Sequence, residues 1–415
     1  MLSLLRKPTN IQTIYLSLVA GNTLATSFIW GINTIFLLSA GLSNFEAFLA
    51  NAFYSVGYVL FEVPTGVIAD TYGRRISYML GALTLAISTA LYLYMWHIQG
   101  PFWGWALSSM VLGLGYTFFS GATEAWLVDA LKATNFKGSL DSVFAKAQIV
   151  GGAAMLIGAI SGGIIAQMTN LGVPYILRTL VLLINFAMAF VLMQDLGFKP
   201  TRPKNPINEM SKIVNKSITY GYKNPPVRWM MLSAPFVVGV SFYIFYALQP
   251  FLLELWGDDK AYAIAGVIAA LTGLSQMAGG FFSPKIRKLF KLRTSYLLAG
   301  TLITGFLLIL VSMVSNFWVA IIVVFLWGLL FAALVPIRQA YLNGLIPSEQ
   351  RATVLSFDSL TGSAGAIAIQ PALGKIADVQ GYPASYAVSS IFQFAAIPFI
   401  YLARRQKPKS DPIEI

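Results

Sequence analysis

Two apolar runs near the start of the chain are joined by the stretch Gly66-Val67-Ile68-Ala69-Asp70-Thr71-Tyr72-Gly73-Arg74-Arg75. Gly73 permits a tight turn, so the two runs can form antiparallel helices. Asp70 can accept hydrogen bonds, and Arg74 and Arg75 can form bidentate pairs with carboxylates. Because these charges separate apolar runs at about residues 45–68 and 76–96, the stretch predicts a charged turn at the edge of a membrane.

The composition of the whole chain agrees with that prediction. Of its 415 residues, 57% are hydrophobic and 11% are charged, and the mean hydropathy is +0.70. Soluble domains carry roughly 25% charged residues, so a soluble fold could not cover its surface with this composition. The same numbers exclude disordered, collagen-like and disulfide-rich secreted chains. Twelve helices of ~20 residues would occupy ~240 residues, close to the hydrophobic fraction. The chain is therefore predicted to be a polytopic integral membrane protein.

Twelve apolar runs are bounded by charged residues, Gly or Pro, with six in each half of the chain. They are too long for barrel strands and lack alternating polarity, so they are predicted to be helices. The runs span about residues 11–38, 45–68, 76–96, 102–130, 143–168, 175–194, 227–256, 261–283, 294–314, 318–346, 353–376 and 385–403. The predicted organisation is an N-terminal six-helix bundle (1–194), a cytoplasmic linker (195–226), a C-terminal six-helix bundle (227–403) and a cytoplasmic tail (404–415).

Lys and Arg side chains predict the orientation of these spans. With the N-terminus in the cytoplasm, only Arg178, Lys260 and Lys375 lie on or near the outside, which leaves 28 − 3 = 25 basic residues inside. The positive-inside rule favours this arrangement, with both termini cytoplasmic. The rule also explains the net charge of +12 without nucleic acid. The first run is too long for a signal peptide and lacks a cleavage site, so it is expected to remain as a span in the cell membrane.

The longest interruption between spans runs from residue 194 to residue 228 and contains five prolines. Within it, apolar residues repeat at helical spacing, which predicts a short amphipathic helix on the inner membrane surface. These residues are Ile207, Met210, Ile213, Val214 and Ile218. A loosely ordered linker is the alternative.

Short matches at a nearly constant offset indicate that the two halves are related. Residues 159–162 (Ala-Ile-Ser-Gly) align with residues 371–374 (Pro-Ala-Leu-Gly) at an offset of 212. Residues 172–174 (Gly-Val-Pro) align with residues 381–383 (Gly-Tyr-Pro) at an offset of 209. Two six-helix repeats with cytoplasmic termini predict halves that are related by an axis along the membrane normal.

The stretch at 66–75 resembles the signature loop of the major facilitator superfamily, Gly-x-x-x-Asp-(Arg/Lys)-x-Gly-Arg-(Arg/Lys). Five of the six defined positions match, while Thr71 replaces the usual basic residue. Residues 62–66, 120–129, 338–343 and 347–353 resemble the bacterial drug-efflux (drug:proton antiporter) branch, and the resemblance covers essentially the whole chain. It implies an all-α integral membrane protein with twelve transmembrane helices in two pseudo-symmetric six-helix bundles.

The same resemblance implies that the loop is a conformational latch on the cytoplasmic side. Asp70 would engage the start of the eleventh helix, across the two halves, and an Arg of the loop would pair with Asp129 at the inner end of the fourth helix. The predicted latch residues are Gly66, Asp70, Gly73, Arg74, Arg75 and Asp129. The alternative is that the arginines only anchor the topology. Residues 158–163 resemble the antiporter signature Gly-Pro-x-x-Gly-Gly, with Ala159 in place of Pro, although close packing of small residues alone would explain them.

Ionisable side chains inside apolar spans are costly, and they usually face a cavity or a partner. The candidates for proton coupling or for recognition of substrate charge are Glu62, Glu124, Arg338 and Asp358. Glu124 is the first choice for proton exchange and Glu62 the second. Arg338 corresponds to Glu124 at an offset of 214, so it could supply a partner to Glu124 or hold an anionic substrate. Structural ion pairing near the inner surface is the alternative for the three acids.

Polar and aromatic side chains within the spans are candidates for the wall of a substrate cavity, where they would suit amphipathic compounds. They are Asn22, Asn33, Tyr243, Tyr246, Gln249 and Gln276. The chain has no Cys and a single His, His97, so no metal site and no cofactor are expected.

The favoured function is secondary active transport by alternating access, with proton-coupled efflux of small amphipathic compounds or drugs. ATP is not expected to drive it, because the sequence lacks a phosphate-binding Gly-x-x-x-x-Gly-Lys-(Ser/Thr) motif. A dedicated exporter or importer of one metabolite is the first alternative. An intramembrane enzyme is the remote alternative, because paired catalytic groups are missing. The expected partners are a small-molecule substrate, protons and membrane lipids, without nucleic acid, and the chain is expected to act as a monomer.

Overall fold

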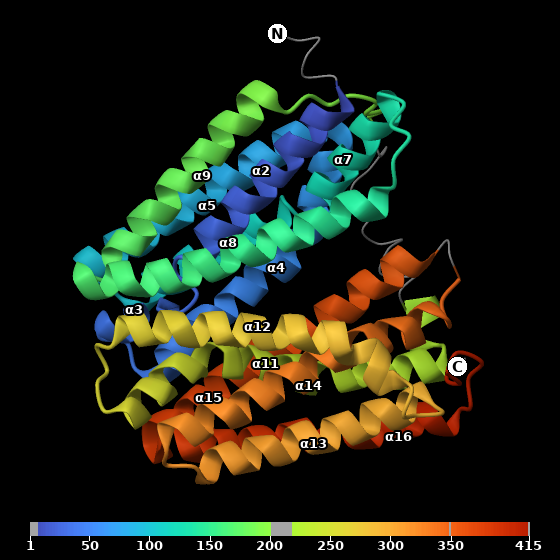
Figure 1. The fold of residues 1–415 in the computed structure, drawn as a ribbon. Helices are drawn as coiled ribbons and strands as arrows, with labels where there is room; N and C mark the ends of the chain where they lie inside the picture. Colours follow the sequence, from blue (N-terminus) through green and yellow to red (C-terminus); the bar gives the residue numbers. More distant parts are fainter. Residues whose placement is uncertain (1–6, 201–217, 348–349, 414–415) are drawn as a thin grey trace. The chain divides into compact units, whose positions relative to one another are not determined.

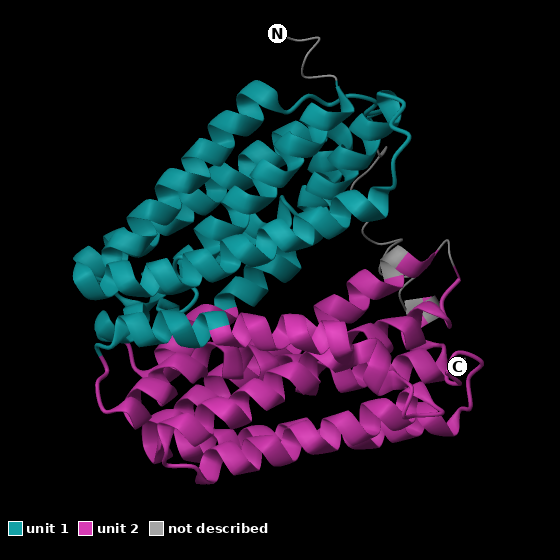
Figure 2. Ribbon diagram, viewed as in Figure 1, with its two compact units in different colours: residues 1–41, 53–206, 260–270 teal, residues 42–52, 207–259, 271–415 magenta. Residues whose placement is uncertain are grey.

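A computed structural model describes residues 7–200, 218–347 and 350–413, in which all the named secondary-structure elements are helices (Figure 1). The all-α prediction is therefore confirmed. The predicted amphipathic helix of the linker lies outside the described residues, except for its last position, Ile218. The helices divide between two compact units, which are coloured separately in Figure 2.

Unit 1 consists of residues 1–41, 53–206 and 260–270, with the gaps given above. Aromatic and aliphatic side chains of α2, α5 and α7 form its core, in which Leu18, Tyr78 and Trp126 are buried. The helices in this part of the chain are α2 (Pro8–Ser27), α3 (Asn33–Ser39), α4 (Asn44–Tyr72), α5 (Arg74–His97), α6 (Phe102–Thr117), α7 (Ala122–Ala133), α8 (Leu140–Met168) and α9 (Gly172–Leu192).

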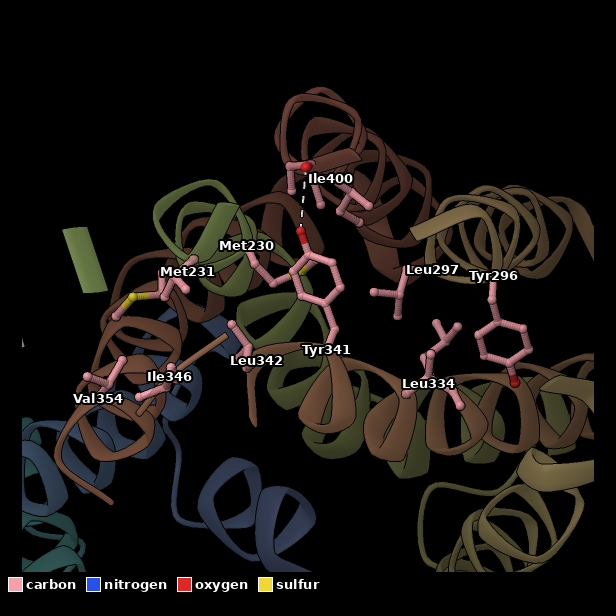
Figure 3. Packing of buried hydrophobic residues seen from close by; sticks show 14 residues of the cluster. Met230, Met231, Tyr296, Leu297, Leu334, Tyr341, Leu342, Ile346, Val354 and Ile400 are labelled. Atoms are coloured by element: carbon pink, nitrogen blue, oxygen red, sulfur yellow. Dashed lines mark hydrogen bonds between the residues drawn. The ribbon is translucent and has the colours of Figure 1, made fainter. Parts of the chain in front are cut away.

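Unit 2 consists of residues 42–52, 207–259 and 271–415, again with those gaps. Its helices are η1 (Ile218–Tyr222), α11 (Pro225–Trp256), α12 (Tyr262–Arg287), α13 (Arg293–Met313), α14 (Phe317–Asn343), α15 (Arg351–Ala395) and α16 (Ile397–Arg405). A cluster of buried apolar residues joins α11, α13, α14 and α16 through Met230, Tyr296, Tyr341 and Ile400 (Figure 3). The Tyr341 hydroxyl donates to the carbonyl oxygen of Ala403 at 3.4 Å, which ties the end of α14 to α16.

The two compact units do not coincide with the two predicted bundles, because the starts of two helices group with the other half of the chain. The start of α4 groups with unit 2, where the backbone N–H groups of Asn44 and Phe45 donate to the carboxylate of Asp378 at 2.8 and 2.9 Å. The start of α12 groups with unit 1, where a Cβ atom at Gly163 would lie only 2.8 Å from the Cα atom of Gly266. The run of small residues at 158–163 thus serves close helix packing.

Nine helices in the described part of the chain are long and apolar enough to cross a membrane. Three features of the helices account for the difference from the twelve predicted spans. The span predicted at 11–38 is the helix pair α2 and α3, and the span at 102–130 is the pair α6 and α7, which is broken before Gly121 with its φ of 66°. The last two predicted spans meet in α15, whose kink at Gly381, with a φ of 81°, lies between them, and the last span continues into α16.

Candidate functional site

The charged turn between α4 and α5 is built around the carboxylate of Asp195. Gly73 has a φ of 112° and begins α5 without a side-chain cap of its own. Asp195 follows the end of α9 and supplies this cap, because its Oδ1 accepts a hydrogen bond from the backbone N–H of Arg75 at 3.0 Å. A Cβ atom at Gly73 would overlap with Asp195 Oδ2. The positive φ and the nearby carboxylate therefore both require glycine at this position.

The two arginines of the turn are held by neighbours within unit 1. The guanidinium of Arg74 forms an ion pair with Asp70 at 2.7 Å and lies over the ring of Phe198. Arg75 donates to the carbonyl oxygen of Phe190 and lies over the ring of the same residue. The Asp70 side chain is 52% exposed, so its pair with Arg74 contributes little stability and mainly orients the guanidinium.

Asp195 is a functional candidate that the sequence prediction missed. Burial raises the pKa of Asp195, while the backbone N–H groups and positive charges of Arg75 and Arg74 oppose that rise. The available signal was an acid directly after an apolar span, on the same predicted side of the membrane as the basic turn. Residues 193–198 form no recognisable motif, so this signal alone does not single out Asp195.

The remaining latch candidates occupy different surroundings. Asp129 is half-buried on α7, and its backbone carbonyl lies against Gly197 in the loop that carries Asp195. In the described ranges, the acid that forms an ion pair with Arg74 is Asp70 rather than Asp129. A Cβ atom at Gly66 would meet no atom within 4 Å. The engagement of Asp70 with the eleventh helix stays a prediction.

The two glutamates proposed for proton exchange differ in their surroundings. Glu62 of α4 is half-buried, and its Oε1 accepts a hydrogen bond from the hydroxyl of Ser120 at 2.7 Å. The hydroxyl of Tyr58, one turn earlier, interacts with the same carboxyl group. Glu124 is exposed in the first turn of α7. Glu62 therefore lies in a polar cluster contributed by α4 and by the break between α6 and α7, whereas Glu124 lies at a surface of unit 1.

Arg338 of α14 and Asp358 of α15 form a bidentate ion pair in unit 2, with both N···O distances at 2.6 Å. Arg338 also donates to the carbonyl oxygen of Met230 on α11 at 3.2 Å, so this cluster joins three helices. The side chains of Arg338 and Asp358 are 23% and 10% accessible. Within unit 2, the acidic partner of Arg338 is Asp358, because α14 and α15 bring the two side chains together. The pairing of Arg338 with Glu124 stays a prediction.

The cavity candidates of unit 1 are partly used in its packing. The side chain of Asn33 is buried, and its Oδ1 accepts a hydrogen bond from the hydroxyl of Tyr175 at 3.1 Å. Asn22 is half-buried on α2, and its Oδ1 has no hydrogen-bond partner among the described residues.

The cavity candidates of unit 2 are spread over α11 and α12. Tyr243 is buried and donates to the hydroxyl of Ser385 at 2.5 Å, and Gln249 is buried near the end of the same helix. Tyr246 is half-buried beside the ring of Phe245, and Gln276 is exposed on α12. A role of these side chains in substrate binding stays a prediction.

Arg178, which the sequence places on or near the outside of the membrane, has a side chain buried within unit 1. Its side chain on α9 is buried, and its Nε donates to the hydroxyl of Thr89 at 3.1 Å. Its terminal nitrogens donate to the carbonyl of Ala25 at 3.4 Å and to the hydroxyl of Tyr116 at 3.5 Å. These partners are all neutral, so Arg178 joins α2, α5, α6 and α9 through hydrogen bonds.

The sequence model of one protein family, described as the Major Facilitator Superfamily, matches residues 15–308 and 288–415. The chain belongs to the Major Facilitator Superfamily. This protein is therefore a membrane transporter for small molecules and not an enzyme. In the residues that the structure describes, no group of three or more His, Cys, Asp or Glu side chains is arranged to hold a metal ion.

The relatives of this major facilitator are distant but extend over almost the whole chain. An uncharacterized MFS-type transporter, YxaM of Bacillus subtilis, is 24% identical over 97% of this chain and 98% of its own length. Multidrug resistance protein MdtG of Dickeya zeae is 24% identical over 93% of this chain and 92% of its own.

Solved structures share the fold of this major facilitator. A bacterial homolog of the human lysosomal transporter Spinster superposes with a TM-score of 0.74 at 15% identity, covering 98% of this chain and 99% of the other. The nucleoside transporter NupG superposes with a TM-score of 0.72 at 11% identity, covering 96% of this chain and 99% of the other. The predicted major facilitator fold is confirmed.

Proposed function

We propose that this major facilitator is a secondary active transporter that works by alternating access and couples the efflux of small amphipathic compounds to protons. The likeness to MdtG, which is named a multidrug resistance protein, supports the class of substrate. The distribution of Lys and Arg supports a position in the cell membrane with both termini in the cytoplasm.

Glu62 is the group that we assign to proton exchange, and its surroundings are the observation that carries this part of the proposal. Its Oε1 accepts the hydrogen bond from Ser120, while Oε2 is buried without a hydrogen bond of normal geometry in the described part of the chain. A carboxylate in such a place is costly, so protonation relieves that cost and deprotonation restores it. Glu124 is solvent-exposed and becomes the second candidate.

The position of Ser120 suggests how a proton on Glu62 acts on the rest of unit 1. Ser120 lies in the break between α6 and α7, next to Gly121 with its φ of 66°. An ionised Glu62 can only accept a hydrogen bond from the Ser120 hydroxyl, whereas a protonated Glu62 can itself donate one. The exchange would therefore alter a contact at the start of α7, the helix that carries Asp129 near its other end. This sequence of contacts links the proton to the proposed latch.

Transport by purified protein in proteoliposomes tests this assignment. A fluorescent cationic dye would be followed in two modes, uphill accumulation driven by a pH gradient and dye exchange without a gradient. Glu62→Gln mimics the protonated carboxyl, so we expect exchange to remain and uphill transport to fall at least tenfold. Glu124→Gln is the matched control and should retain both activities.

Two results would overturn parts of the proposal. Uphill transport that survives in Glu62→Gln but is lost in Glu124→Gln would move proton exchange to Glu124. Wild-type protein that moves one metabolite and no amphipathic dye would favour the dedicated exporter or importer instead.

A further inference from the structure

The C-terminal tail folds back onto unit 2 and caps the start of α13. The carboxylate of Asp411 accepts two hydrogen bonds from Thr294, one from the backbone N–H and one from the hydroxyl, both at 2.8 Å. The N-cap position of α13 is Leu292, which has no side-chain cap of its own. Asp411 therefore provides the anionic cap that the first turn of this helix lacks.

The residues on either side of Asp411 are anchored as well. The hydroxyl of Ser410 donates at 3.0 Å to the carbonyl of Tyr341, in the last turn of α14, where helix carbonyls have no partner within the helix. The backbone N–H of Ile413 donates to the carbonyl of Lys291 at 3.0 Å. A Cβ atom at Gly344 would lie 2.6 Å from the Cβ of Ser410, so the tail packs closely on the end of α14. Residues 410–413 are thus packed onto unit 2 and hydrogen-bonded to it.

This anchoring gathers positive charge at one end of unit 2. The loop segment 284–293 and the tail segment 404–413 together contain nine basic residues and one acid, and that acid is the buried Asp411. An isolated β-bridge between Leu292 and Pro412 holds the two segments side by side. Seven of the basic side chains are exposed: Lys285, Lys288, Lys291, Arg404, Arg405, Lys407 and Lys409. We call these seven residues the tail–loop patch.

Exposed apolar side chains border the tail–loop patch. Leu289 is 80% exposed, and Phe281 is 69% exposed on the last turns of α12. The Lys285 ammonium lies 5.5 Å from the ring centres of both Phe281 and Phe282. Cations beside exposed apolar side chains suit the boundary between lipid headgroups and acyl chains, where both kinds of group are satisfied at once. A soluble anion would leave the apolar side chains in water.

We propose that the tail–loop patch binds the headgroups of anionic phospholipids, and that Asp411 is the positioning residue that assembles it. The assignment to the inner leaflet rests on the proposed orientation of the chain. Asp411 contributes no attraction for the lipid, because its charge has the wrong sign. Its role is to hold Lys407 and Lys409 beside Lys288 and Lys291.

The negative charge of Asp411 gives a test that distinguishes two explanations of lipid binding. One is a patch that Asp411 assembles, and the other is attraction that depends only on the net charge. Binding of dioleoyl phosphatidylglycerol to the purified full-length protein in detergent would be measured by native mass spectrometry, with dioleoyl phosphatidylcholine as the neutral lipid. Asp411→Ala raises the net charge by one, so general attraction predicts tighter binding of the anionic lipid. The proposal predicts weaker binding, because the tail is released.

Two further variants keep the test independent of how well Asp411→Ala folds. Thr294→Val removes one tail hydrogen bond without a change of charge, and it should also weaken binding. The pair Lys291→Gln/Lys409→Gln should lower the affinity about tenfold, since each cation near an anionic membrane surface contributes appreciably. The matched control is Lys132→Gln/Lys137→Gln, which removes the same charge from exposed positions in the last turn of α7 and in the loop after it, and should leave the affinity unchanged.

Either of two outcomes would overturn the inference. One is anionic lipid binding that is unchanged or stronger in both Asp411→Ala and Thr294→Val. The other is an equal loss of affinity in the two lysine pairs. Both measurements concern lipid binding alone, so they stand or fall independently of proton coupling and of the transported substrate.

Discussion

Removing both members of the Arg338–Asp358 pair should destabilise the protein by less than the sum of the two single removals. The pair is bidentate at 2.6 Å, and the side chains are only 23% and 10% accessible. Deleting one partner of a buried pair costs about 3–5 kcal/mol, because the other charge stays buried alone. The partial exposure of Arg338 places the expected cost of Asp358→Ala near the lower end, at about 3 kcal/mol. Arg338→Ala should cost a similar amount.

The double variant Arg338→Ala/Asp358→Ala leaves no uncompensated charge. Its cost should therefore fall below the sum of the single costs by about 2 kcal/mol. The assay is the free energy of unfolding in mixed detergent and sodium dodecyl sulfate micelles, followed by tryptophan fluorescence. The same cycle on Arg74 and Asp70 is the control, and its coupling should stay below about 1 kcal/mol because Asp70 is 52% exposed. Additive costs at Arg338 and Asp358 would refute the view that this pair is desolvated and coupled.

Three other predictions concern the turn around Asp195. Gly73→Ala should lower the free energy of unfolding by about 1–3 kcal/mol, because alanine is strained at a φ of 112° and its Cβ meets the Asp195 carboxylate. The control Gly280→Ala, whose Cβ meets no atom within 4 Å, should be nearly neutral. Equal effects of the two variants on the free energy of unfolding would contradict this prediction. Burial raises the pKa of Asp195, so between the ordinary carboxyl pKa and the raised pKa the folded state holds a proton that the unfolded state has lost. The contribution of Asp195 to stability is therefore complete below the ordinary carboxyl pKa and is lost as the pH rises through the raised pKa. As pH rises, the free energy of unfolding should therefore fall less steeply in Asp195→Asn than in the wild type. Parallel curves for the two proteins would show that Asp195 does not cause this pH dependence. Asp70→Asn should reduce dye transport while leaving equilibrium dye binding to the purified protein largely intact, and a collapse of binding with unaltered exchange between conformations would exclude the latch.

The overall class of this protein could be predicted from sequence because it depends on properties of single segments. A run of about 20 apolar residues spans a bilayer whatever its neighbours are, so composition and run length were enough for a polytopic helical membrane protein. The spacing of Gly66, Asp70, Gly73 and the two arginines identified the family, because a tight charged turn constrains residues that are close in the chain.

Helix boundaries were less predictable, since an apolar run looks the same whether its helix is continuous or broken. The span at 102–130 contains the break before Gly121, and the span at 11–38 contains the break between α2 and α3. Hydropathy does not report the backbone angles at these positions. Glycine is compatible with a helix as well as with a break, and the tertiary contacts decide between them.

The choice of charge partners was decided by the tertiary structure alone. A motif suggested Asp129 for the turn, but the carboxylates observed there are Asp70 and Asp195. The carboxylate observed at Arg338 is that of Asp358. Asp195 lies 120 residues from Arg75, and Asp411 lies 117 residues from Thr294. A hydrogen bond or a buried ion pair needs its two groups within about 3 Å in a suitable direction, and only the packing of helices distant in the chain sets that distance.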